Sequence, residues 1–232
     1  MCRADRARVR RLCRAALALA AAACALPAAA ATPLEMPTPT REIAAPDVEQ
    51  LRQTVTRFND LIGGYPTRLA SPAQREATYA AWSQALQQAW WLQAREPDSE
   101  DSLLLLSELY RQGHNMDVRG AGERADETVQ RCIRLHPDSM GCHFSAAYFY
   151  LSIDPRFAAK GEASLHRLHA MYAPQLNAAV ERGLVFAYLY QGRKGDARRQ
   201  LDVVLGLQPD APWALRMRDA LDKGEPAVLP GR

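Results

Sequence analysis

Apolar positions recur at helical spacing along most of this chain. Residues 47–61 and 72–95 each place apolar side chains on one face, at the three-to-four-residue spacing of an amphipathic helix. The dipeptide Ser71-Pro72 is a helix-start signal for the second segment. An N-terminal helical hairpin is therefore predicted over residues 47–96. The apolar positions of the first segment are Leu51, Val55, Phe58 and Leu61.

Prolines separate the later helical segments at regular intervals. Pro97, Pro137, Pro174 and Pro209 follow one another after 40, 37 and 35 residues. Proline lacks an amide hydrogen, so it ends one helix and is tolerated in the first turn of the next. A period of this length is typical of stacked helical hairpins. Each interval is predicted to contain two helices joined by a turn.

The clearest repeat runs from Ala178 to Pro209, and its key positions resemble the tetratricopeptide repeat family. Those positions are Leu184, Tyr188, Gly192, Ala197, Leu201 and Pro209. Glu181 and Val185 depart from the aromatic residue and the glycine of the family pattern. The resemblance implies an all-α fold, a right-handed α-solenoid of antiparallel hairpins over residues 97–225. Its last segment, Pro212 to Lys223, is expected to be a capping helix.

The first two repeats are longer than the third. Tyr110 and Ala125 stand six residues further apart than the corresponding positions of the clearest repeat. The residues between them, 112–122, are polar and rich in glycine, so we interpret them as an inserted loop. Asp154-Pro155 marks a turn in the second repeat.

The resemblance also implies a function, because tetratricopeptide arrays present their first helices as a concave groove for peptides or helices of partner proteins. Aromatic residues beside arginine suit such an interface. Leu104 and Leu151 also stand at groove positions of the family pattern, and packing in the core between hairpins is the alternative for both. The negative charge of Glu108 argues against a terminal carboxylate as the ligand. The predicted groove residues are Glu108, Arg111, Phe144, Tyr148, Arg182, Phe186 and Leu189. The partner is expected to be a protein or peptide.

The N-terminal residues 1–31 read as a secretory signal. Six arginines precede an apolar run from Ala15 to Leu26, and Ala29-Ala30-Ala31 offers a small-residue cleavage site. The apolar run is shorter than a bilayer requires, and no other stretch approaches that length. We therefore expect no transmembrane helix and an exported protein, periplasmic or secreted. Scarce lysine beside abundant arginine and alanine is typical of a GC-rich bacterial genome.

A lipoprotein signal is the alternative, with Cys24 acylated at the start of the mature chain. It fits less well, because Ala21 stands where such signals usually carry leucine. Acylation would make the Pro-rich, flexible segment 32–46 a tether between the cell envelope and the folded domain. Residues 226–232 are expected to be a disordered tail.

Removal of residues 1–31 changes the charge balance. The whole chain has 29 Lys and Arg against 26 Asp and Glu; the signal holds six Arg and one Asp, which leaves 23 basic and 25 acidic residues. The mature chain then has a formal net charge near −2 and no basic stripe, which argues against nucleic acid as a partner.

Two cysteines, Cys132 and Cys142, remain after the signal and stand five residues on either side of Pro137. In an oxidising compartment they can close a disulfide between neighbouring helices. The alternative is a pair of buried thiols that pack as small apolar residues.

The sequence contains no clear catalytic constellation, metal site or cofactor motif. His166 and His169 share a helical face, but no cysteine or carboxylate at matching spacing completes a zinc site. His114, Asn115 and Asp117 are the best polar cluster and are typical of a turn. We expect a non-catalytic adaptor without a cofactor. The alternative is an enzyme subunit with its site in residues 112–122.

Overall fold

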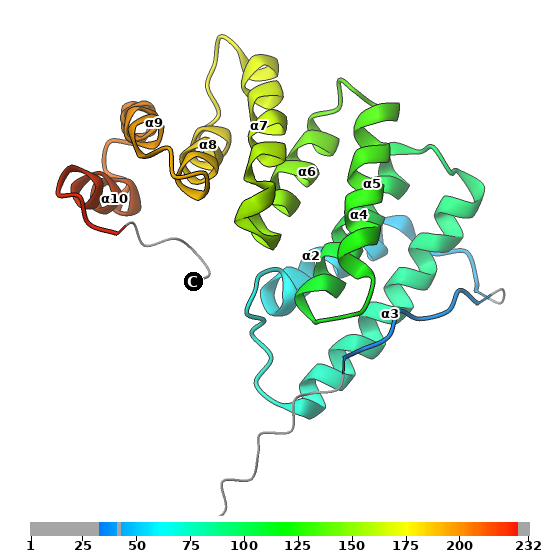
Figure 1. Cartoon of the computed structure of the whole chain (residues 1–232). Helices are drawn as coiled ribbons and strands as arrows, with labels where there is room; N and C mark the ends of the chain where they lie inside the picture. The colour runs from blue at the N-terminus through cyan, green and yellow to red at the C-terminus, as the bar shows by residue number, and fades with distance from the viewer. Residues whose placement is uncertain (1–32, 41–42, 227–232) are drawn as a thin grey trace, which may run out of the picture. The chain divides into compact units, whose positions relative to one another are not determined.

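The computed structural model describes residues 33–40 and 43–226, and these residues form an all-α fold (Figure 1). The predicted signal segment with Cys24, and residues 227–232 of the predicted tail, lie outside the described residues. None of the described helices has the length and apolar character needed to cross a membrane. The helices are α2 (Val48–Ile62), α3 (Pro72–Arg95), α4 (Glu100–Asn115), α5 (Ala121–Leu135), α6 (Met140–Ile153), α7 (Ala158–Tyr172), α8 (Ala178–Tyr190), α9 (Lys194–Leu207) and α10 (Pro212–Asp222), with a 3₁₀ turn at Pro155–Phe157.

Successive helices pack as antiparallel hairpins, which confirms the predicted solenoid. Helices α4 and α5, α6 and α7, and α8 and α9 form the three hairpins, and α10 covers α9 as the expected capping helix. Helix α2 packs against α3 and also against α4. In the same way α4 packs against α6, and α6 packs against α8. The helices α2, α4, α6 and α8 are thus the first helices of four stacked pairs. We call these helices and α10 the A helices.

Local sequence explains where the hairpins turn and the helices start. Gly192, between α8 and α9, has a φ of 73°, a left-handed conformation that costs glycine little. Ser139 caps α6, because its hydroxyl accepts a hydrogen bond from the Cys142 amide at 3.0 Å. Pro72 and Pro212 occupy the first turns of α3 and α10, where the missing amide hydrogen costs nothing.

The core is a row of apolar clusters between neighbouring helices. One cluster joins α2, α3, α4, α5 and α6, a second joins α6, α7, α8 and α9, and a third joins α8, α9 and α10. Trp82 is completely buried in the first cluster and donates its ring N–H to the Leu109 carbonyl at 2.8 Å. Each A helix therefore contributes apolar residues to the core, and α4 is buried around most of its surface.

The inserted loop predicted over residues 112–122 is much shorter in the structure. Helix α4 continues to Asn115 and α5 begins at Ala121, so only residues 116–120 are outside a helix. The polar side chains of Gln112 and Asn115 are buried and donate hydrogen bonds to the carbonyls of Val55 and Ile62, each at 2.9 Å. The prediction was wrong because polar residues that bind the backbone of another helix resemble loop residues in sequence.

Part of the segment predicted as flexible is bound to the helices. The Leu34 backbone forms a parallel bridge with Val118, and the Tyr79 hydroxyl donates to the Glu35 carbonyl at 2.6 Å. The side-chain amide of Gln87 donates to the Thr38 carbonyl at 2.7 Å. Residues 34–38, part of the segment 32–46 predicted to be flexible, are thus held along α3 and the α4–α5 turn. Partners distant in sequence make these contacts, so local composition does not reveal them.

Candidate functional site

An open groove with a volume of about 890 Å³ lies along α6, α8 and α10. Its walls are mostly apolar and aromatic, and small residues such as Ala147 and Ala179 lie between the larger ones. The Phe186 and Trp213 rings stack with centroids 5.7 Å apart, which joins α8 to α10 along one wall. The larger apolar lining residues of the three helices are Phe144, Tyr148, Leu151, Phe186, Trp213 and Met217.

The groove follows a regular pattern on its three helices. Phe144, Arg182 and Arg216 each stand five residues after the N-cap of their helix, which is Ser139, Asn177 or Ala211. One turn later, nine residues after the same caps, stand Tyr148, Phe186 and Ala220. All six residues line the groove. Equivalent positions of stacked hairpins thus form two rows across it.

The turn after α2 contributes the groove residues that lie farthest from α6, α8 and α10 in the sequence, Gly63, Gly64 and Tyr65. This turn is held by Arg111 on α4, whose guanidinium donates to the Gly63 carbonyl at 2.5 Å and to Asn59 Oδ1 at 2.9 Å. Glu108 pairs with the same guanidinium. The side chain of Arg111 is only 3% exposed. Arg111 therefore has a structural role under the turn.

Four of the seven predicted groove residues line this groove, namely Phe144, Tyr148, Arg182 and Phe186. Glu108 and Arg111 are not among the lining residues: Arg111 holds the turn after α2, and Glu108 pairs with Arg111. Leu189 is half-buried and packs between the second and third core clusters. Of the two leucines with core packing as an alternative, Leu151 lines the groove and Leu104 packs beside the disulfide.

Sequence reasoning missed the contribution of α10. Trp213, Arg216 and Met217 line the groove, although this helix was predicted only as a cap. The available signal was the repeat period. Arg182 and Arg216 are 34 residues apart in the sequence, and each stands five residues after the N-cap of its helix. The turn at Gly63–Tyr65 had no comparable signal, because its place depends on how α2 packs against α4.

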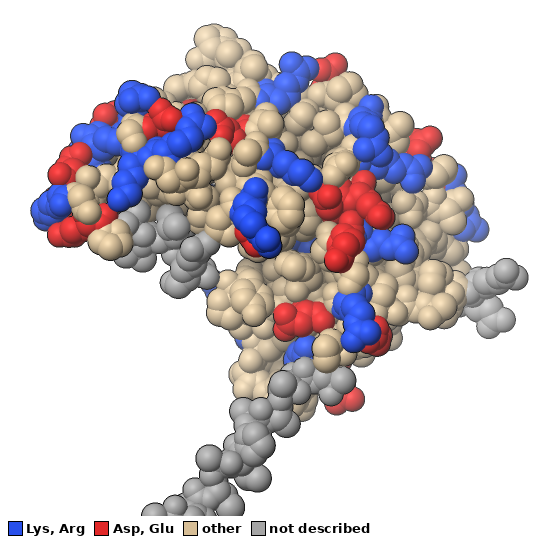
Figure 2. Space-filling model, in the orientation of Figure 1, with Lys and Arg blue, Asp and Glu red and all other residues tan. Residues whose placement is uncertain are grey.

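Charged side chains are few in the groove. Asp154 lies at the end of α6 and pairs with Arg156 at 2.9 Å. Arg182 and Arg216 are exposed and form no ion pair with any residue in the described part of the chain. Figure 2 shows Lys and Arg interspersed with Asp and Glu on one face of the molecule. Outside the groove, Arg198 pairs with Asp222 at 2.6 Å.

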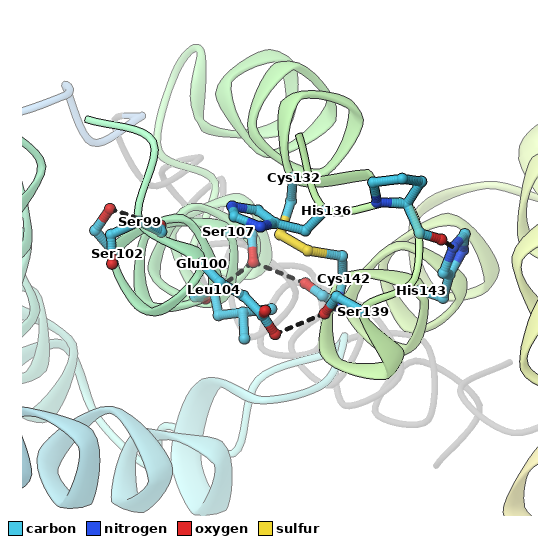
Figure 3. Close-up of a disulfide and its surroundings, with 12 residues drawn as sticks. Ser99, Glu100, Ser102, Leu104, Ser107, Cys132, His136, Ser139, Cys142 and His143 are labelled. Carbon is cyan, nitrogen blue, oxygen red and sulfur yellow. Dashed lines mark hydrogen bonds between the residues drawn. A yellow bond between two sulfur atoms is a disulfide. The ribbon is translucent and has the colours of Figure 1, made fainter. Parts of the chain in front are cut away.

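The two remaining cysteines form a disulfide between α5 and α6 (Figure 3). The Cys132 and Cys142 sulfur atoms are 1.99 Å apart, and both residues are buried. Around them Ser139 donates to Glu100 at 2.6 Å, and the hydroxyls of Ser107 and Ser145 lie 2.7 Å apart. The bond joins the second helix of one hairpin to the first helix of the next.

The histidines of α7 bind separate carboxylates. His169 Nδ1 lies 2.8 Å from the buried carboxylate of Glu181, and His166 Nε2 lies 3.3 Å from Glu162. Glu162 also pairs with Arg193 at 2.8 Å. Within residues 33–40 and 43–226, no three His, Cys, Asp or Glu side chains converge as metal ligands would.

The three polar residues of the alternative enzyme site, His114, Asn115 and Asp117, differ in their surroundings. His114 is half-buried, and burial lowers the pKa of its imidazole. Asp117 is exposed in the turn, with a φ of 62°. Asn115 binds the Ile62 carbonyl. None of the three lines the groove.

Comparison with known proteins gives one informative result. No protein-family model matches the sequence, and no curated protein matches it. Among solved structures, a thermophilic TPR protein of Thermus thermophilus is similar, with a TM-score of 0.50 and 20% sequence identity. The match covers 76% of this chain and 92% of that one. The described fold is therefore a TPR-like α-solenoid, and at this identity the similarity concerns the fold alone.

Proposed function

We propose that this protein is a non-catalytic scaffold that binds an apolar segment of a partner protein in the groove of α6, α8 and α10. The observation that carries the proposal is the aromatic lining of an open groove. Tyr148 is 59% exposed there, and Tyr65, also 59% exposed, lines the same groove. Exposed apolar surface rimmed by polar residues is typical of an interaction site.

The composition of the groove supports a protein partner. Tyrosine, tryptophan and arginine are the residues that most often dominate binding energy at protein interfaces, and all three line this groove. Phe186 and Trp213 are already stacked, so their contact surface is ordered before a partner arrives. The repeat architecture adds a rigid support, since each A helix is packed on a hairpin behind it.

A photo-crosslinking experiment tests the groove directly. A benzophenone amino acid replaces Tyr148 in one variant and Met140 in another; Met140 is on the same helix, 46% exposed, and is not a groove residue. We expect light-dependent adducts with a partner protein from position 148 and not from position 140. Equal labelling at both positions, or labelling only at 140, would place the partner elsewhere and contradict the proposal.

We also propose that the protein works outside the cytoplasm. The N-terminal pattern of arginines followed by an alanine-rich run is typical of a secretory signal. The Cys132–Cys142 disulfide supports an oxidising compartment, because disulfides are rare in the cytosol of most organisms. Cell fractionation is expected to place the protein in the periplasm or the medium. A protein that stays in the cytosol with full-length mass would contradict this.

The mass of the mature N-terminus separates the two kinds of export. Cleavage after residue 31 leaves a chain that begins at Thr32, whereas acylation leaves a chain that begins at Cys24 with lipid attached. We favour the first, because Ala21 is unusual three residues before a lipidated cysteine. Serine at position 24 is then expected to leave location and mass of the mature chain unchanged. A shift into the soluble fraction caused by Cys24→Ser would favour the lipid-anchored alternative.

A further inference from the structure

We propose that the groove selects a partner segment with acidic side chains at its α8–α10 end and apolar side chains at its α6 end. The inference rests on the proposed function, since it specifies what the groove would bind. It comes from the two rows of side chains across the groove. In the first row an aromatic ring, Phe144, is followed by two guanidinium groups, those of Arg182 and Arg216.

The two arginines differ from Arg193 and Arg198, which lie nearby at and within α9. Arg193 pairs with Glu162 at 2.8 Å and with Asp196 at 2.6 Å, and Arg198 pairs with Asp202 at 2.6 Å. Arg182 and Arg216 have no such carboxylate among the described residues. They lie in a groove that a bound segment would cover. A ligand carboxylate would supply the pair that the protein itself does not provide.

Burial under a ligand makes this pairing selective. A guanidinium that loses water without gaining a partner is costly, and the cost falls when a carboxylate accepts its hydrogen bonds. An apolar segment without acidic groups would cover Arg182 and Arg216 and leave them unpaired. A segment with lysine or arginine at that end would be repelled. Discrimination between ligands thus follows from two side chains on adjacent A helices.

The α6 end of the groove favours apolar side chains of the ligand. Tyr148 and Leu151 line it, and Arg111 links Tyr148 to the turn at Gly63–Tyr65, which lines the same groove. The guanidinium of Arg111, 4.7 Å from the Tyr148 ring, is already neutralised by Glu108. Asp154 is paired with Arg156. This end therefore presents apolar and aromatic surface, and its charges are balanced within the chain.

Selection from a random 12-residue peptide display library tests the proposal with the purified protein. The wild type is compared with R182E/R216E, and R68E/R134E is the matched control. Arg68 and Arg134 are exposed, lie outside the groove, and change the net charge by the same amount. We expect peptides selected by the wild type and by the control to be enriched in Asp and Glu. Those selected by R182E/R216E should be enriched in Lys and Arg.

Binding of one selected acidic peptide then gives a magnitude. Its affinity for R182A/R216A should fall by about tenfold, because two partly desolvated ion pairs are lost. The affinity of the wild type should also fall as salt concentration rises. The circular dichroism of each variant should be unchanged, since both side chains are exposed and unpaired within the described chain.

The outcomes separate the inference from the proposed function. Apolar peptides that compete for the groove without any acidic bias, or a bias that R182E/R216E does not reverse, would overturn the inference and leave the scaffold proposal standing. Selected peptides whose binding is unaffected by Tyr148→Ala and by changes at both arginines would overturn both, because the groove would not be their site.

Discussion

The guanidinium carbon of Arg111 lies 4.7 Å from the centre of the Tyr148 ring. This contact links a buried, ion-paired arginine to a well-exposed aromatic residue of the groove, and it connects α4 to α6. On its other side the same guanidinium holds the Gly63 carbonyl. Arg111 therefore fixes the turn that forms one end of the groove, although it is not itself a lining residue.

Replacement of Arg111 is expected to destabilise the protein. Arg111→Ala leaves the Glu108 carboxylate and the Gly63 carbonyl without their shared partner, which should lower the free energy of unfolding by about 3 kcal/mol. Arg111→Lys should recover only part of this loss, because an ammonium group lacks the planar fork. Urea denaturation measures both. Arg134→Ala, an exposed control, should change stability by less than about 0.5 kcal/mol. An Arg111→Ala protein as stable as this control would contradict the assignment.

The Cys132–Cys142 disulfide is expected to stabilise the folded chain. The two cysteines are separated by 10 residues, and closure of so short a loop in the unfolded chain corresponds to about 2 to 3 kcal/mol. Dithiothreitol should lower the free energy of unfolding of the wild type by that amount. The C132A/C142A variant should show the lower stability without reductant and no further change with it. A wild-type stability that is unchanged after full reduction would contradict the prediction.

A hydrogen bond between Tyr150 and Asp126 should make stability depend on pH. The Tyr150 hydroxyl donates to Asp126 Oδ1 at 2.5 Å. Burial alone would raise the pKa of the Asp126 carboxyl, but the hydrogen bonds from Tyr150 and Gln130 more than offset this and hold the pKa below its usual value. A depressed folded-state pKa contributes stability above the unfolded value, near 4, and that stability is lost as the pH falls through the folded value.

Unfolding of the wild type and of Tyr150→Phe should therefore be compared between pH 7 and pH 2. The wild type should be more stable at neutral pH, by about 1 kcal/mol or less because Asp126 is partly solvated. The difference should shrink as the pH falls below about 4. Burial and the hydrogen bond to Asp126 also raise the pKa of the Tyr150 phenol, so the phenol should stay protonated at pH 10 in the folded protein. A difference that is independent of pH would contradict the coupling.

Two helical glycines should respond in opposite directions to alanine. A Cβ at Gly113 would lie 2.5 Å from Trp82 Cζ2, in the core, whereas a Cβ at Gly206 would meet nothing within 4 Å. Gly113→Ala should cost about 1 to 3 kcal/mol through overpacking. Gly206→Ala should stabilise α9 by about 0.5 to 1 kcal/mol, because alanine favours the helix. Thermal unfolding of both variants measures the contrast. A neutral Gly113→Ala would show that Trp82 can move.

The fold could be predicted well from the sequence for a physical reason. Helical amphipathicity and the effect of proline depend on only a few neighbouring residues. The helix over residues 72–95 and the helix ends near Pro137 and Pro209 can therefore be recognised from the local sequence. The repeat period then determined that hairpins would stack, and the positions within each repeat identified Phe144, Tyr148, Arg182 and Phe186 as groove residues.

Contacts between distant segments required the tertiary structure. Gln112 and Asn115 are polar and buried because carbonyls of α2 accept their hydrogen bonds, so the sequence made them resemble a loop. Arg111 does not line the groove, because its guanidinium binds the Gly63 carbonyl of the turn after α2, 48 residues away in sequence, and Glu108 pairs with Arg111. The sequence by itself therefore determined the helical repeats and the positions in each repeat that share a helix face. Only the tertiary structure decided which of those faces stay exposed to solvent. The reason is that burial depends on contacts with segments distant in sequence, such as the turn after α2.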